Sequence, residues 1–422
     1  MIHGHRFSQA KAGGESRPGR IEENNPSADG SVVGNSPSAL WFSDTDVGRV
    51  WVFDGAAKLP PAVWRNAFRG HLCDHRFYEV TESTLADQFD SRYFLLQDRA
   101  SGAYAVQPFF FVRQDLAAGL APGARAWVER LRRRWPNLFY LRMLMVGSPA
   151  AEGRLDRRER WACLALRQAL LGYARAARPS IILLKDFPAE YRPVLQDFCA
   201  HGFRRMPGLP GAQLRLNFST FEDYLQTRLS KAYRKSLRRK FKALAQGPPL
   251  KMDVVTDLSP HLDEVLALHR QVYDRARLRF ERLNRAYFLQ LNDRMAERIR
   301  GFLWRREGRL IAFNLCLEHE GTLHDLEVGF DYRVALDLHL YFVTWRDVIS
   351  WCLDRGLHTY QAGPLHYDPK FHLRLELLPQ DIYARHRSRW LNPIMGLVMD
   401  LLGPVRHEPI LKRFPNYLEL FG

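Results

Sequence analysis

One order of predicted elements occurs twice along this chain, and this repeat constrains the fold more than any other feature. Each half contains a hairpin, a strand, a helix and a short apolar strand. These lie at 93–112, 141–146, 158–177 and 181–184 in the first half, and at 302–317, 324–330, 337–354 and 358–361 in the second. The third strands begin 183 residues apart, and the short apolar strands 177 residues apart. The sequence therefore predicts a duplicated α/β unit.

The rest of the chain divides around this repeat. In residues 1–40, eighteen residues are Gly, Ser, Pro or Asn, and apolar periodicity is absent, which predicts a disordered tail. The predicted organisation is this tail, a first unit, a basic connecting helix, a second unit and an apolar helical C-terminal segment. Their bounds are 1–40, 41–219, 220–247, 248–390 and 391–422.

The positive charge of the chain is concentrated locally. Lys and Arg number 62 against 46 Asp and Glu, a formal net charge of +16. Eight of the 15 residues at 228–242 are Lys or Arg and none is acidic, which predicts one helix with a basic face that includes Arg234 and Arg238. This face is interpreted as an anion-binding surface for RNA, lipid headgroups or a diphosphate. The alternative is a solvated helix with a packed apolar stripe.

Several classes of protein are disfavoured by what the sequence lacks. Five widely spaced cysteines do not make a disulfide framework and indicate a reducing, cytoplasmic setting. No apolar run has the length of a membrane span. The spacing of His71, Cys73 and His75 does not fit structural zinc sites, so we expect no metal. P-loop and Gly-x-Ser-x-Gly motifs are also absent.

The repeated order resembles the GNAT acyltransferase unit, and its doubling resembles the FemAB-like proteins, which include the Fem-type peptidoglycan aminoacyltransferases. Two stretches carry the resemblance: the basic segment 229–242, and 356–373 with its Gly, Tyr and Lys residues. It implies tandem GNAT-like units, each a mixed central sheet flanked by helices. The sequence departs from the GNAT pattern at 330–339, because the Gly-containing pyrophosphate loop typical of GNAT proteins is not found there.

The resemblance implies an acyltransferase that moves an acyl group from acyl-CoA to an amine or hydroxyl of a small molecule or a cell-envelope precursor. Two alternatives stay open. One is transfer from an aminoacyl-tRNA, and the other is a non-catalytic protein that binds RNA or an anionic membrane. We expect a cytoplasmic protein, peripheral to the inner membrane face if it meets a membrane, with no obligate protein partner.

The candidate catalytic residues follow from the same resemblance. Glu327 lies on the strand where GNAT enzymes carry a carboxylate that removes the acceptor's proton, with Asp331 as a second candidate. A period of two places Asp325, Glu327 and Gly329 on one face of that strand. Tyr367 is the candidate that protonates the leaving group.

Two loops are candidates for binding. Lys370 and Arg374 are predicted to clamp an anionic group beyond Gly363, which exposes backbone N–H groups; an ordinary turn is the alternative. Gly147, Gly153 and Arg154 form a loop between a strand and a helix that is predicted to hold a cofactor diphosphate, unless it is a plain connection. The C-terminal segment is expected to dock on the body rather than lie on a membrane.

Overall fold

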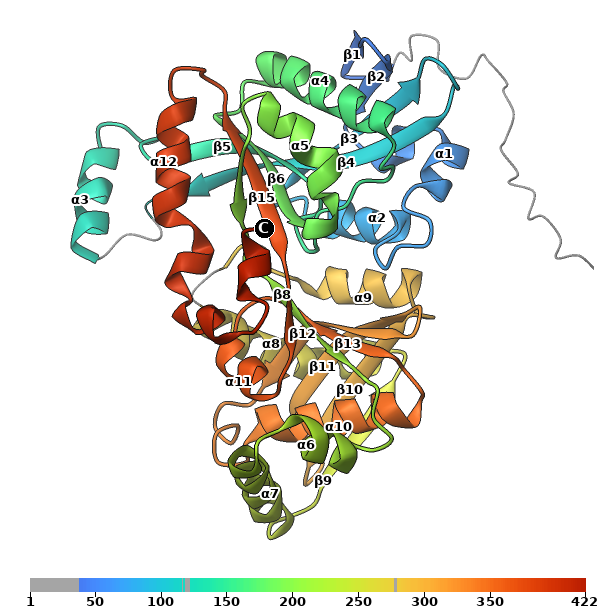
Figure 1. The fold of residues 1–422 in the computed structure, drawn as a ribbon, viewed down its shortest axis with the longest axis vertical. Coiled ribbons are helices and arrows are strands. Elements are labelled where there is room, and N and C mark those ends of the chain that lie inside the picture. The colour runs from blue at the N-terminus through green and yellow to red at the C-terminus, as the bar shows by residue number, and fades with distance from the viewer. Residues whose placement is uncertain (1–37, 116, 118–121, 277–278) are drawn as a thin grey trace, which may run out of the picture. The chain divides into compact units, whose positions relative to one another are not determined.

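The computed structural model describes residues 38–422 except 116, 118–121 and 277–278. Most of the predicted tail therefore lies outside the described residues. The predicted fold class is confirmed, because two mixed sheets flanked by helices make up the described chain (Figure 1).

The first sheet has the order β1-β2-β3-β4-β5-β6-β15-β7. Its strands are β1 Trp41–Asp44, β2 Gly48–Phe53, β3 Asp90–Asp98, β4 Tyr104–Asp115, β5 Tyr140–Val146, β6 Ile181–Pro188, β7 Arg204–Pro207 and β15 Gln380–His386. Its helices are α1 Pro61–Asn66, α2 His75–Thr84, α3 Pro122–Arg132, α4 Arg160–Ala177, α5 Arg192–Ala200 and α12 Asn392–Leu402. Only β5 and β6 pair in parallel among these neighbours.

The second sheet has the order β14-β8-β13-β12-β11-β10-β9. Its strands are β8 Gly211–Arg215, β9 Leu250–Val255, β10 Ile299–Arg306, β11 Arg309–His319, β12 Thr322–Phe330, β13 Thr359–Ala362 and β14 Glu376–Leu378. Its helices are α6 Phe221–Arg228, α7 Lys231–Ala245, α8 Leu262–Arg275, α9 Arg285–Arg294, α10 Leu340–Asp354 and α11 Tyr367–His372.

The two sheets exchange strands. β8 lies at the end of the predicted first unit, yet it pairs with β13 and β14 of the second sheet. β15 lies at the end of the predicted second unit, yet it pairs with β6 and β7 of the first sheet. The prediction of two contiguous units at 41–219 and 248–390 does not include this exchange of strands. Because each sheet contains a strand from the other half, the halves cannot separate without breaking strand pairing.

Three hydrophobic clusters account for most of the interior. One packs α4 and α5 on the first sheet, and another packs α6, α7 and α10 on the second. The third lies between the sheets and combines α2 side chains such as Phe77 with α8 and α9 side chains such as Val265 and Leu291. Apolar burial shared by both halves therefore contributes to the stability of the fold, alongside the core of each sheet.

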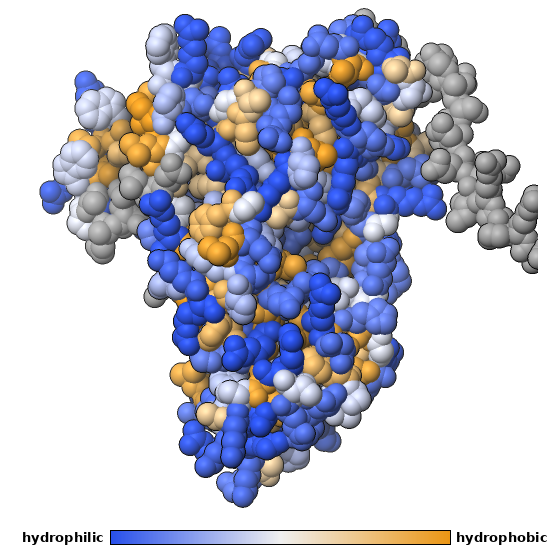
Figure 2. Space-filling view, in the orientation of Figure 1, coloured by the Kyte–Doolittle hydropathy of each residue, from blue (hydrophilic) through white to orange (hydrophobic). Residues whose placement is uncertain are grey.

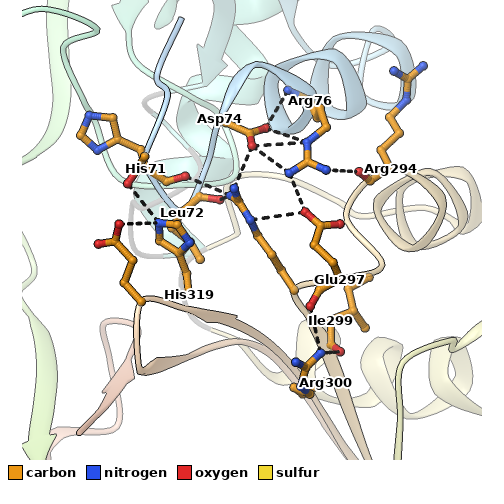
Figure 3. Close-up of polar contacts among 12 residues, drawn as sticks. His71, Leu72, Asp74, Arg76, Arg294, Glu297, Ile299, Arg300 and His319 are labelled. Carbon is orange, nitrogen blue, oxygen red and sulfur yellow. Dashed lines mark hydrogen bonds and ion pairs between the residues drawn. The ribbon is translucent and has the colours of Figure 1, made fainter. Parts of the chain in front are cut away.

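A polar network also joins the halves (Figure 3). Asp74 caps the start of α2 by accepting from the backbone N–H of Arg76, and it pairs with Arg298 at 3.0 Å. Arg76 lies 2.6 Å from Glu297, at the turn before β10. Arg298 also donates to the carbonyl oxygen of His71 at 3.0 Å. These contacts fix α2 of the first half against the α9–β10 turn of the second.

The predicted basic helix at 228–242 is two helices. Its chain bends at Leu229, where the backbone is extended, and Ser230 caps α7 by accepting from the N–H of Tyr233. Within α7 the predicted division of faces is confirmed, since Leu237 is buried while Lys235 and Arg239 are exposed.

Candidate active site

A β-bulge in β12 controls where its carboxylates point. Glu327 is paired with Leu315 and Asp325 with Cys316, so Leu326 is the extra residue. The prediction that Asp325 and Glu327 share a face is therefore wrong, because the extra residue breaks the period of two. Cys316 belongs to the cluster under α10 and Leu315 to the cluster under α8. Asp325 faces α10, whereas Glu327 faces α8 and the first sheet.

Glu327 is paired with a histidine of α8. Oε2 of Glu327 lies 3.1 Å from Nε2 of His269, and the Glu327 side chain is 24% exposed. Gly329 allows α8 to approach, since a Cβ there would lie 2.8 Å from Cβ of Leu268 and would overlap the ring of Phe313. The carboxylate is thus held by a side chain while one edge stays open to solvent.

A second bulge presents charged groups from the first sheet. On β6, Lys185 and Asp186 together oppose Ile382 of β15, and Asp186 has a left-handed backbone with φ +53°. Nζ of Lys185 lies 2.7 Å from Oδ2 of Asp186 and 3.4 Å from the carbonyl oxygen of Ala151. Nζ also lies 5.5 Å from the ring centroid of Phe280, in the loop after α8. Lys185 thus contacts both halves of the protein.

Charged groups from both halves meet around this lysine, and we call them the inter-sheet cluster. Its members are Glu152, Arg154, Lys185, Asp186, His269, Glu281 and Glu327. Burial opposes the charge of Lys185, but attraction to Asp186, Glu281 and Glu152 outweighs it and raises the pKa of Lys185. Burial, with repulsion from Glu327, raises the pKa of Glu281 against the attraction of Lys185.

Glu152 is held at the edge of the cluster. It accepts from the side-chain amide of Gln380 at 2.7 Å and pairs with Arg154 at 3.4 Å. Burial is the main reason that the pKa of Glu152 is raised. The cluster has four carboxylates and two cations, Arg154 and Lys185. This excess of carboxylates favours the binding of a positively charged ligand.

Comparison with protein families assigns part of the chain. Residues 231–370 match the family described as Acetyltransferase (GNAT) domain. This segment is a GNAT acyltransferase domain. It includes both members of the Glu327–His269 pair and most of the second sheet.

Solved structures resemble the chain at low identity, whereas no curated protein matches it. L-PGS from Bacillus licheniformis shows 14% identity, 78% of this chain and 96% of that chain covered, and a TM-score of 0.48. The C-terminal domain of a putative lysylphosphatidylglycerol synthetase from Agrobacterium fabrum shows 10% identity, 79% and 94% coverage and 0.47. FemX shows 12% identity, 76% and 94% coverage and 0.49. The family assignment rests on residues 231–370.

In the GNAT domain, most backbone N–H groups of the loop between β12 and α10 are hydrogen-bonded within the protein. N–H groups of this loop donate to acceptors inside the protein at residues 331, 332, 333, 334, 335, 338, 339 and 340. Asp331, a predicted catalytic residue, is fully buried and accepts from the N–H and guanidinium of Arg333 and from Arg309. These hydrogen bonds hold the Asp331 carboxylate within the turn after β12, and this geometry does not favour proton transfer to it. Most of the loop's N–H groups are therefore not free to bind a diphosphate.

The predicted phosphate loop of the first half is likewise closed. The N–H of Gly147 donates to the carbonyl of Pro108, and the N–H of Gly153 to that of Asp186. A Cβ at Gly153 would overlap the carbonyl oxygen of Lys185 and the ring of Phe187. The helix α4 begins only at Arg160. These glycines therefore bring the loop close to β6, and the geometry does not favour the predicted diphosphate site.

The predicted residues around α11 are directed inward. The hydroxyl of Tyr367 donates to the carbonyl of Pro210 at 2.8 Å, and burial raises the pKa of Tyr367, which disfavours it as a proton donor. Lys370 is buried and donates to the carbonyl oxygens of Gly363 and of Leu365. Arg374 is exposed beyond the end of α11. The predicted Lys370–Arg374 clamp is therefore not assembled.

Lys370 is instead attracted by the buried carboxyl of Asp325, which lies on the face of the second sheet opposite Glu327. Asp325 accepts from the hydroxyl of Tyr360 at 2.6 Å. Burial raises the pKa of Asp325 to about 6, against the effects of Tyr360 and Lys370. Burial lowers the pKa of Lys370 to about 8, with Asp325 opposing. This group lies under α10 and has the features of a structural polar core.

The predicted binding residues of the basic segment serve the α6–α7 junction. Arg234 donates to the carbonyl oxygens of Gln226 and Leu229 at 2.8 and 2.9 Å, and Arg238 pairs with Glu222. The guanidinium of Arg234 thus closes the end of α6, whereas Arg238 is exposed and pairs with the first turn of that helix. Within the described residues, no group of side chains could hold a metal ion.

Sequence reasoning missed Lys185, Asp186 and His269. A signal existed for the first two, because a charged pair directly follows the apolar run 181–184 and therefore lies at the carboxyl end of a buried strand. His269 lies at helical spacing from the buried Val265 and Leu262 of α8, a pattern typical of a core face, and its partner on β12 depends on the bulge.

Proposed function

We propose that the protein transfers an acyl group to an amine bound at the inter-sheet cluster, with Glu327 as the base. The observation that carries this proposal is the Glu327–His269 pair, whose carboxylate lies on the bulged strand of a GNAT domain and is partly open to solvent. An ammonium has no lone pair, so its proton must leave before nitrogen can attack a carbonyl carbon.

The proposed reaction begins with the removal of a proton from the acceptor. The carboxylate of Glu327 accepts a proton from the acceptor ammonium, while His269 fixes the orientation of that carboxylate. The free amine attacks the carbonyl carbon of the donor and a C–N bond forms. The bond from carbon to sulfur or oxygen then breaks, and the second proton of the nitrogen passes to the departing sulfur or oxygen. A thiolate leaving group is a weak base near neutral pH, so it needs little help from a protein acid.

The charge of the cluster supports a cationic acceptor. Glu152, Asp186 and Glu281 come from different segments and approach one lysine, leaving a surplus of negative charge. Such a surplus attracts an ammonium group and disfavours a purely anionic acceptor. We therefore propose a small amine, or an amine on a cell-envelope precursor, as the acceptor class.

The donor is proposed to be an acyl-CoA, which is the usual donor for GNAT domains. An aminoacyl-tRNA is the second candidate, and one observation favours it. The backbone donors at 331–335 and 338–340 are used internally, so this loop offers few free N–H groups to a CoA diphosphate. A tRNA ester requires no such loop and would instead contact exposed cations such as Lys235 and Arg239.

The test uses the full-length protein and two donor sets with the same pool of amines. One set contains acyl-CoA thioesters, with free thiol and acylated amines measured by mass spectrometry. The other contains tRNA charged with labelled amino acids, with label in the amine fraction measured. Amine-dependent product in either set supports acyl transfer and identifies the donor. Background levels in both sets would leave a non-catalytic binding protein as the better account.

A further inference from the structure

Large apolar side chains are exposed at one end of the first sheet. Seven of them lie in two short segments, around α3 and before and along α12. They are Trp127, Trp135, Phe139, Trp390, Leu391, Ile394 and Leu397, with exposed fractions between 43% and 75%. Figure 2 shows hydrophobic side chains among hydrophilic ones in this region, at the left of the view.

The topology brings the two segments to the same end of the sheet. The α3 segment leaves the sheet after Asp115 of β4 and returns at Tyr140 of β5. Met143 of β5 pairs with Ile181 of β6, which pairs with His386, the last residue of β15. The chain then enters α12, so α3 and α12 extend from neighbouring positions, as Figure 1 shows.

Helix α12 packs on the first sheet with one side, and its apolar side stays exposed. The side chain of Asn392 donates to the carbonyl of Gly202 at 2.7 Å, and its oxygen accepts from the N–H of His386 at 2.8 Å. Gly396 packs closely on Arg204, since a Cβ there would lie 3.2 Å from Nε of that side chain. Ile394 and Leu397, three residues apart on the other side, contribute nothing to this contact and stay exposed.

The surrounding charge is positive. Residues 122–140 contain five arginines and one acidic residue, and 385–391 contain three arginines and none. Arg132 is used by Asp115 and Glu129, but six other arginines of these segments are exposed: Arg125, Arg130, Arg133, Arg134, Arg387 and Arg389. Exposed Trp and aliphatic side chains within an arginine-rich rim are the composition of a surface that binds anionic membranes.

We propose that this end of the first sheet, formed by α3, the 385–391 segment and α12, docks on the surface of an anionic lipid bilayer. A second copy of the chain fits less well, because a two-fold contact would bring the arginine rims together. RNA could stack on the exposed aromatic rings, but it leaves the aliphatic Leu391, Ile394 and Leu397 unexplained, since they offer no ring to a base. Within the described residues, no helix is long and apolar enough to cross a membrane. The proposal does not depend on the acyl-transfer reaction.

The test is flotation of the full-length protein with vesicles of phosphatidylcholine, with and without phosphatidylglycerol. Two variants remove the surface: Ile394→Ser with Leu397→Ser, and Arg387→Ser with Arg389→Ser. Two controls match them elsewhere: Leu289→Ser with Leu336→Ser, and Lys235→Ser with Lys242→Ser on α7. Circular dichroism and thermal unfolding check that each variant is folded, and light scattering reports self-association.

We expect salt-sensitive binding that requires phosphatidylglycerol. Loss of the two arginines should weaken partitioning roughly tenfold or more, and loss of Ile394 and Leu397 should do the same, while both controls bind like the wild type. The proposal is overturned if anionic vesicles are not bound, or if the α7 control loses binding as much as the arginine variant. Self-association that these variants abolish, without vesicle binding, would equally contradict it.

Discussion

Nε2 of His269 lies 3.1 Å from Oε2 of Glu327, across the contact between α8 and the bulged strand β12. If His269 positions the carboxylate, its replacement should lower turnover more than it affects substrate binding. We expect His269→Phe to reduce kcat about tenfold to a hundredfold with little change in KM. His269→Gln keeps a side-chain donor and should recover part of the loss. Equal activity of the two variants would assign His269 to packing alone.

Lys185 should be required for stability at the inter-sheet cluster. Lys185→Met leaves Glu281 and Asp186 without their cation, and a broken buried pair costs about 3 kcal/mol of unfolding free energy. Because Lys185 has a raised pKa, its contribution is present at neutral pH and is lost only as the pH rises through that value. The variant removes this contribution and allows the pKa of Glu281 to rise further.

Denaturant unfolding at several pH values measures this effect. A carboxyl with a raised pKa binds its proton more tightly in the folded state, so the Lys185→Met variant should lose stability as the pH rises from acidic to neutral. Lys251→Met, at an exposed lysine of β9, is the matched control. A variant as stable as this control would show that Lys185 is not holding the carboxylates together.

Asp325 should make stability depend on pH in a defined window. Its pKa is about 6 in the folded protein against an ordinary 3.8, so the folded state binds the extra proton. Unfolding free energy should therefore fall as the pH rises from about 3.8 to about 6, by at most about 3 kcal/mol. Asp325→Asn should remove this fall, whereas Asp337→Asn at an exposed position should retain it. The same fall in Asp325→Asn would assign it to other groups.

Gly153 should be required for the approach of its loop to β6. A Cβ at this position overlaps the carbonyl of Lys185 and the ring of Phe187, so Gly153→Ala should cost about 1–3 kcal/mol and displace Lys185. Gly363→Ala is the control, because a Cβ there meets nothing within 4 Å. Thermal unfolding and the transfer assay together check this prediction. Equal stability of the two variants would contradict the close approach.

The sequence predicted the elements well because each depends on local pattern. The repeat placed β5, β6, β12 and α10 within a few residues of their observed bounds. The exchange of β8 and β15 between the sheets could not be predicted, since both are short strands whose residues suit either sheet. Strand pairing over such separations is decided by tertiary packing.

The site was predicted only where it depends on a single strand. Glu327 was found from its place on β12, but the bulge at Leu326 reversed its expected relation to Asp325. A bulge adds one residue to one strand, and the alternation of side chains then changes beyond it. Tyr367 and Lys370 were chosen for their chemistry, yet burial directs their polar atoms to backbone carbonyls. Burial of that kind depends on the C-terminal residues that cover α11, such as Phe414.

The central claim is that Glu327 removes a proton during acyl transfer, and Glu327→Gln tests it most directly. The amide keeps the size of the side chain but cannot accept the proton. We expect kcat for the transfer of the labelled acyl group to fall about 10²- to 10⁴-fold, with thermal stability unchanged. Glu320→Gln, at an exposed turn, should keep full activity. Wild-type turnover in Glu327→Gln would contradict the account.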